Sequence, residues 1–169
     1  MSEKMQPEEV VSILNEYLTE MIDIIFEYHG TLDKFIGDAV MAVWGAPVMV
    51  ENHAELAVRA AWAMREKVME LRVKWEKEGK RKIGVGMGVN TGDMVVGNMG
   101  SSQFSDYTVI GDNVNLAARL EENAMGGQLI ISETTYEEVK DIVEVKQLDP
   151  LRVKGKEKPV EVYEVTGLK

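Results

Sequence analysis

The stretch Leu32-Asp-Lys-Phe-Ile-Gly-Asp-Ala-Val-Met-Ala-Val-Trp44 contains two short strand-like runs, one on each side of Gly37-Asp38-Ala39. Runs of this length, separated by a turn that contains glycine and aspartate, are typical of a β-hairpin. The stretch therefore predicts a hairpin made of residues 32–36 and 40–44, with Asp38 at its tip.

Helical patterns flank this hairpin on both sides. Pro7 suits a first helical turn, and the apolar spacing that follows predicts a helix to about His29. Its apolar stripe is wider than one buried face needs, so it indicates either a well-buried core helix or a helix that also meets a second surface. A second amphipathic helix is expected from about Asn52, as N-cap, to Glu78.

The remainder of the chain alternates short strands and helices. The expected elements are a second hairpin turning at 91–93, a flexible stretch at 97–102, a helix from about 114 to 126, a strand at 129–131, a short helix at 132–139, and strands at 143–145 and 160–165. The resulting order, αββαββαβαββ, predicts one α+β domain over residues 1–169, with one sheet and helices on one side of it.

Composition narrows the class of protein. The chain has 169 residues, 45% of them hydrophobic, and a formal net charge of −10, so it has enough apolar residues for a core and is disfavoured as a nucleic-acid binder. It has no cysteine, which excludes disulfides and thiolate zinc sites. No apolar run is long enough to span a membrane, and no signal peptide is evident, so we expect no membrane insertion and a cytoplasmic location.

Four segments carry the functional information. They are Lys34-Phe-Ile-Gly-Asp38, Gly97-Asn-Met-Gly100, Asp106-Tyr-Thr-Val-Ile-Gly-Asp-Asn-Val-Asn-Leu-Ala-Ala-Arg119 and Val153-Lys-Gly-Lys156. In this order they resemble segments of the class III nucleotide cyclases, which include adenylate and guanylate cyclases, and the resemblance covers nearly the whole chain. Four ordered segments are far more specific than one glycine motif.

The resemblance implies a ferredoxin-like cyclase homology domain that works as a head-to-tail homodimer. ATP or GTP would bind at the interface, with two Mg²⁺ or Mn²⁺ ions as cofactors. The reaction would yield a 3′,5′-cyclic nucleotide and pyrophosphate.

Lys34 and Thr108 occupy the positions at which, by resemblance, the family reads the purine. A lysine can donate to a ring nitrogen, and a threonine hydroxyl can accept from the adenine amino group but can also donate. Guanine-reading members have Glu and Cys, or similar residues, at these positions. The pair therefore predicts an adenine reader, although Lys34 alone would be interpreted as a surface strand lysine.

The other candidate residues are expected to bind the metal, the ribose and the phosphates. A carboxylate such as Asp38 suits Mg²⁺, although aspartate more often stabilises turns. By resemblance, Asn115 positions the ribose and Arg119 stabilises charge on the α-phosphate. Their spacing of four residues puts both on one face of a helix. From the residues alone, the simpler interpretation is an exposed polar pair. Lys154 matches the lysine that holds the terminal phosphates, and a solvated turn is its alternative.

Two departures from the family pattern concern activity. Family members open with a strand whose aspartate shares the metal ions with the Asp38 position, and the chain, expected to be truncated at its N-terminus, lacks this strand. Asp33 is an unsuitable replacement, because on an ideal strand it faces away from Asp38. Gln103 stands where many members have Arg or Lys. We therefore expect weak cyclisation, and a sheet that either closes its gap by rearranging or associates with another chain.

The leading interpretation is an adenylate cyclase catalytic domain of intracellular signalling, acting on ATP, with an upstream sensor or regulatory domain possible in a longer protein. The alternative is a catalytically inactive cyclase-like domain that dimerises or binds nucleotide. The set of retained site residues favours the former, and the missing aspartate favours the latter. A diguanylate cyclase is nearly excluded, because no Gly-Gly-Asp/Glu-Glu-Phe motif occurs.

Overall fold

The computed structural model describes residues 5–103 and 105–169, and for residues 105–107 it describes the backbone only. The elements, in chain order, are α1 (Pro7–Glu27), β1 (Thr31–Ile36), β2 (Ala39–Val43), α2 (His53–Lys77), β3 (Met87–Val89), β4 (Val95–Gly100), β5 (Ser105–Ile110), α3 (Asp112–Asn123), β6 (Leu129–Ser132), α4 (Glu133–Val139), β7 (Val143–Gln147) and β8 (Val162–Leu168). The predicted α+β class is confirmed, with β5 as a strand that the sequence did not predict.

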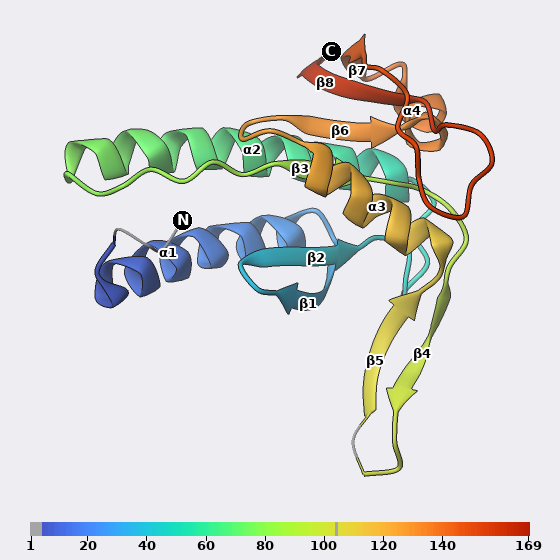
Figure 1. Cartoon of the computed structure of the whole chain (residues 1–169), viewed down its shortest axis with the longest axis horizontal. Coiled ribbons are helices and arrows are strands. Elements are labelled where there is room, and N and C mark those ends of the chain that lie inside the picture. Colours follow the sequence, from blue (N-terminus) through green and yellow to red (C-terminus); the bar gives the residue numbers. More distant parts are fainter. Residues whose placement is uncertain (1–4, 104) are drawn as a thin grey trace.

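The two long helices, α1 and α2, lie side by side and run in opposite directions (Figure 1). Ile13 and Met21 of α1 pack with Val68 and Trp75 of α2, and all four side chains are almost completely buried. The first helix is therefore a core helix, as the simpler of its two interpretations predicted. Among the described helices, none combines the length and the apolar character that a membrane span needs.

The largest sheet among the described residues, the central sheet, has four strands in the order β3-β6-β8-β7. Leu129 and Ile131 of β6 face α2 and α4, whereas Ile130, between them, packs against α3. Helices therefore cover both faces of this sheet, and the prediction of helices on one side was wrong. The physical reason is that β6 is apolar at consecutive positions, which requires cover on both faces.

The predicted hairpin at 91–93 is not formed. Instead, β3 pairs in parallel with β6, and β4 pairs in antiparallel register with β5, so that Gly97 lies opposite Thr108. The stretch expected to be flexible is therefore largely strand. Gly88 explains the position of β3, since a Cβ there would come within 2.5 Å of the Glu121 backbone nitrogen in α3.

Both hairpins stand apart from the central sheet, and the β4–β5 hairpin projects away from the body of the molecule (Figure 1). Within the described residues, β1 and β2 pair only with each other. The expectation of one continuous sheet was therefore wrong. The structure does not show the rearrangement that would have closed a gap in the sheet: within residues 5–103 and 105–169, the β1–β2 hairpin does not pair with the central sheet, and β3 lies at an edge of that sheet.

Candidate functional site

The outer face of α3 carries two of the predicted site residues. Leu116 and Leu120 are buried against the sheet, so Asn115 and Arg119, one turn apart, point outward and are exposed. The helix begins after Gly111, whose φ of 139° lies in the region that favours glycine. This glycine turns the chain from β5 directly into α3.

Hydrogen bonds attach the first turn of α3 to the edge of the central sheet. Asn90, which follows β3, donates through Nδ2 to the Asn113 carbonyl oxygen at 2.9 Å. The Asn113 side chain donates to the Asp93 carbonyl oxygen, and Ser132 at the end of β6 donates to Asn90 Oδ1 at 2.6 Å. The start of the helix that carries Asn115 and Arg119 is thereby held in one place.

An open groove of about 430 Å³ brings together Asn115, Arg119 and Lys154. Lys154 comes from the loop between β7 and β8, which turns at Gly155 with a φ of 90°. Val153, next to Lys154, packs against the cluster formed by α3 and the sheet, so this loop is held beside the helix. Three of the six predicted site residues therefore line a single cavity.

Glu122 also lines this groove and was missed by the sequence analysis. Its Oε2 atom lies 2.6 Å from Nη1 of Arg119 in an ion pair between two half-exposed side chains. The spacing of three residues on a helix was the signal that could have revealed it. Any anion that binds Arg119 must compete with this carboxylate, which costs little because exposed ion pairs contribute at most about 1 kcal/mol.

Lys34 and Thr108 form a second group with Asp33. Thr108 Oγ1 donates to Asp33 Oδ2 at 3.0 Å, and Lys34 Nζ lies 3.6 Å from the same oxygen. Asp33 was considered in the sequence analysis only as a poor replacement for a metal ligand. The groove described above includes neither Lys34 nor Thr108 among its lining residues.

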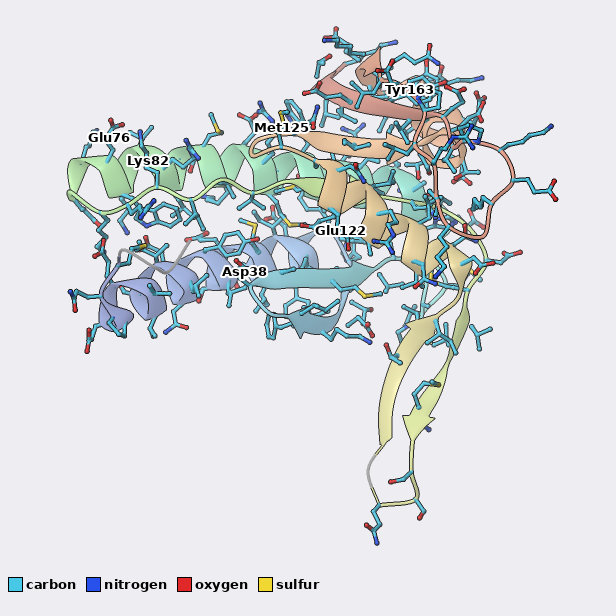
Figure 2. All side chains as sticks on the ribbon, viewed as in Figure 1. Asp38, Glu76, Lys82, Glu122, Met125 and Tyr163 are labelled. Atoms are coloured by element: carbon cyan, nitrogen blue, oxygen red, sulfur yellow. The ribbon has the colours of Figure 1, made fainter. Side chains whose placement is uncertain are left out.

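Asp38 lies in the turn between β1 and β2, where Gly37 has a φ of 63° (Figure 2). Ile36 pairs with Ala39, so Asp38 is part of the turn itself, at the tip of the hairpin as predicted. Asp38 is exposed, and its charge helps to raise the pKa of two nearby groups. Burial is the larger cause at both: it raises the pKa of Tyr17 to about 12 and that of Glu121 above its ordinary value.

The donor set at Asp38 fits only part of a magnesium site. Carboxylate oxygens are the ligands that Mg²⁺ prefers, and Asp38 supplies two of them at an exposed position. Within residues 5–103 and 105–169, however, no three His, Cys, Asp or Glu side chains gather around a common point. Asp38 is therefore suited to be one ligand among several, and the described residues do not complete a two-ion site.

Comparison with known proteins identifies the family. Residues 1–167 match the family described as the adenylate and guanylate cyclase catalytic domain. The chain is 35% identical to adenylate cyclase 1 of Rhizobium meliloti, over 99% of this chain and 25% of that protein, and 34% identical to an adenylate cyclase of Anabaena cylindrica, over 98% and 34%. It thus spans about a quarter to a third of the length of these relatives.

Solved structures of cyclases have the same fold. The adenylyl cyclase CyaB from P. aeruginosa superposes with a TM-score of 0.90 at 39% identity, covering 98% of this chain and 86% of the other. The guanylyl cyclase Cya2 superposes with a TM-score of 0.93 at 38% identity, covering 99% and 85%. Adenylyl and guanylyl cyclases are thus about equally similar to this chain, so overall similarity does not determine whether the substrate is ATP or GTP. The match over residues 1–167 shows that the chain belongs to the adenylate and guanylate cyclase catalytic domain family.

Proposed function

We propose that this domain is an adenylate cyclase that converts ATP to 3′,5′-cyclic AMP and pyrophosphate in a signalling protein. The observation that carries the proposal is the groove in which Asn115, Arg119 and Lys154 meet. An amide, a guanidinium and an ammonium group along one groove supply what a ribose and a chain of phosphates require. The choice of ATP is supported by Lys34 and Thr108, which Asp33 holds together.

In the proposed reaction, the ribose 3′-hydroxyl gives up its proton to solvent and its oxygen bonds to the α-phosphorus. The bond from the α-phosphorus to the oxygen that bridges it to the β-phosphorus breaks on the opposite side, and pyrophosphate leaves with that oxygen. Asn115 orients the ribose by hydrogen bonding, so that the attacking oxygen is in line. Arg119 exchanges Glu122 for the α-phosphate and stabilises the charge that develops there, while Lys154 holds the terminal phosphates. A bound Mg²⁺ or Mn²⁺, with Asp38 as one ligand, would supply further charge stabilisation.

We further propose that two copies of the chain build each site. Lys34, Thr108 and Asp38 would come from one protomer, and Asn115, Arg119 and Lys154 from its partner. The separation of these residues into two groups within one chain supports this arrangement, since the groove holds one group and the hairpin and β5 hold the other.

A second candidate function is nucleotide binding without turnover. The observation that favours it is the incomplete metal site, in which Asp38 is not joined by two further ligands among the described side chains. A domain of this kind would still bind the nucleotide and dimerise, and it would act by regulating a partner domain.

The test compares formation of cyclic AMP and cyclic GMP from equal concentrations of ATP and GTP with Mn²⁺. We expect cyclic AMP to predominate, and Arg119→Ala to lower kcat by about 100-fold, because charge stabilisation at the reacting phosphate is lost. Arg59→Ala is the matched control, since Arg59 also forms a surface helix ion pair, with Glu55.

A preference for GTP would contradict the adenine assignment. Binding of ATP without any cyclic product would instead support the second candidate function.

A further inference from the structure

Asp33 occupies an irregular position in β1. Leu32 pairs with Ala42 and Lys34 pairs with Met41, so Asp33 is an extra residue without a partner in β2. At such a β-bulge the regular alternation of side chains is broken, and neighbouring side chains can point to the same side of the strand. Asp33 contacts Thr108 of β5, and Lys34 forms an ion pair with the same carboxylate.

The Asp33 side chain is only 6% exposed, whereas that of Lys34 is 44% exposed. Burying a carboxylate is costly unless it is paired and hydrogen bonded. Its Oδ2 atom has two partners, the Thr108 hydroxyl at 3.0 Å and the Lys34 ammonium at 3.6 Å. The cost of burying the Asp33 carboxylate is therefore offset by Thr108 and Lys34, the two residues that we propose for reading the base.

The direction of the hydrogen bond to Thr108 has a consequence for recognition. A carboxylate only accepts, so the hydroxyl must donate its single proton to Asp33, and Thr108 Oγ1 is left with lone pairs alone. The ammonium of Lys34 forms an ion pair with Asp33 at 3.6 Å, which is too long for a hydrogen bond, so its N–H groups can serve another acceptor. The two residues therefore present one acceptor and one donor.

We propose that Asp33 is a positioning residue for base selection, because it commits the Thr108 hydroxyl to act as an acceptor beside a lysine donor. This inference rests on the proposed function, in which Lys34 and Thr108 contact the purine. Adenine offers an amino donor at C6 and an acceptor at N1, which complements the pair. Guanine has an acceptor at O6 and a donor at N1, so that both contacts would be mismatched.

Without Asp33, the hydroxyl would be free to rotate and donate to guanine O6. The carboxylate therefore converts an ambiguous hydroxyl into a group of one polarity. Mismatched polar contacts in a buried site discriminate strongly, because the unpaired groups lose their hydrogen bonds to water.

The experiment measures kcat/KM for ATP, for GTP and for purine riboside triphosphate, which lacks the C6 amino group. We expect Asp33→Ala to lower the ATP:GTP ratio about tenfold, and to lower the ratio of ATP to purine riboside triphosphate as well. Asp33→Leu, which fills similar space without an acceptor, provides a second variant if alanine impairs folding. Asp141→Ala, at an exposed aspartate distant in sequence, is the control.

A double-variant cycle separates this role from a general structural one. In a Thr108→Val background, Asp33→Ala should change the ATP:GTP ratio by less than about twofold, since the hydroxyl through which Asp33 acts is gone. An equal change in both backgrounds overturns the inference. So does an unchanged ratio when Asp33 is replaced in the otherwise wild-type protein.

Calorimetric binding of non-reactive ATP and GTP analogues to the same variants gives a readout that does not depend on turnover. If the wild-type protein forms no cyclic nucleotide, the proposed cyclase activity is contradicted. The role of Asp33 is then tested only by the ratio of the ATP-analogue affinity to the GTP-analogue affinity. A fall in the ATP:GTP binding ratio on replacing Asp33 supports the inference. Equal binding of the two analogues by the wild-type protein overturns it.

Discussion

Tyr17 of α1 is a buried phenol whose ionisation should be visible in the stability of the protein. Burial, followed by the charges of Asp38 and Glu121, raises its pKa to about 12, above the ordinary value of 10.0. Below pH 10 the phenol is neutral in both the folded and the unfolded chain. Between these two pKa values the unfolded chain loses the proton while the folded chain retains it, so the free energy of unfolding falls as pH rises.

We expect this loss to reach about 2 kcal/mol by about pH 11.5, relative to Tyr17→Phe, which has no ionisable group. Urea unfolding of both proteins at about pH 9 and about pH 11.5 measures it, because the lysines titrate in both and cancel in the difference. Equal losses of unfolding free energy in the two proteins would show that Tyr17 does not contribute to the pH dependence of stability.

Asp33 shows at the same scale what strand alternation alone does not predict. An ideal strand puts neighbouring side chains on opposite faces. The bulge between Leu32 and Lys34 breaks that rule, and the hydrogen bond from Thr108 joins residues 75 positions apart. A bulge depends on how β1 pairs with β2, and the pattern within β1 does not record it.

Among the elements, α1 and α2 are joined through the Glu16 carboxylate in addition to their apolar packing. Glu16 accepts from Trp75 Nε1 at 2.6 Å and from Lys74 Nζ at 2.5 Å, and the bond from Lys74 is the main reason that the pKa of Glu16 lies below its usual value. Trp75 is fully buried, whereas Lys74 is half exposed. The bond to Trp75 is therefore the one whose loss would leave a buried donor unpaired.

We expect Glu16→Leu to lower the free energy of unfolding by about 2 kcal/mol, the usual cost of an unsatisfied buried donor. Lys74→Met should cost less than about 1 kcal/mol, since it removes only a partly exposed ion pair. Urea unfolding at neutral pH measures both variants. Equal costs would mean that the ion pair, and not the indole, accounts for the contribution of Glu16.

The predictions for whole elements succeeded where the pattern was local. The periodicities of α1, α2 and α3, and the hairpin of β1 and β2, were visible in short windows. The pairing partner of β3 was not visible in this way, because a strand of three residues fits an antiparallel hairpin or a parallel pair equally well. Its parallel pairing with β6, 42 positions later at Met87 and Leu129, is a long-range contact.

For the whole molecule, the proposed two-chain site makes a prediction about mixtures. Lys34→Ala and Arg119→Ala dimers should each be nearly inactive, because each has the same defect in both of its sites. After mixing, half of the dimers would combine the two chains and contain one intact site of two, so activity should recover to about a quarter of the wild-type value. Native mass spectrometry confirms that mixed dimers form, and their presence without recovery would contradict the arrangement.

The sequence by itself determined the α+β class, the long helices, the first hairpin and the family, since these depend on local periodicity, turn chemistry and four ordered segments. It also singled out Asn115, Arg119 and Lys154, which the fold gathers along one groove. Only the tertiary structure decided that helices cover both faces of the sheet, that β4 pairs with β5, and that Glu122 and Asp33 contact the candidate site residues. The physical reason is that strand pairing, bulges and the placement of buried charges are set by contacts between distant segments, which a pattern read along the chain does not contain.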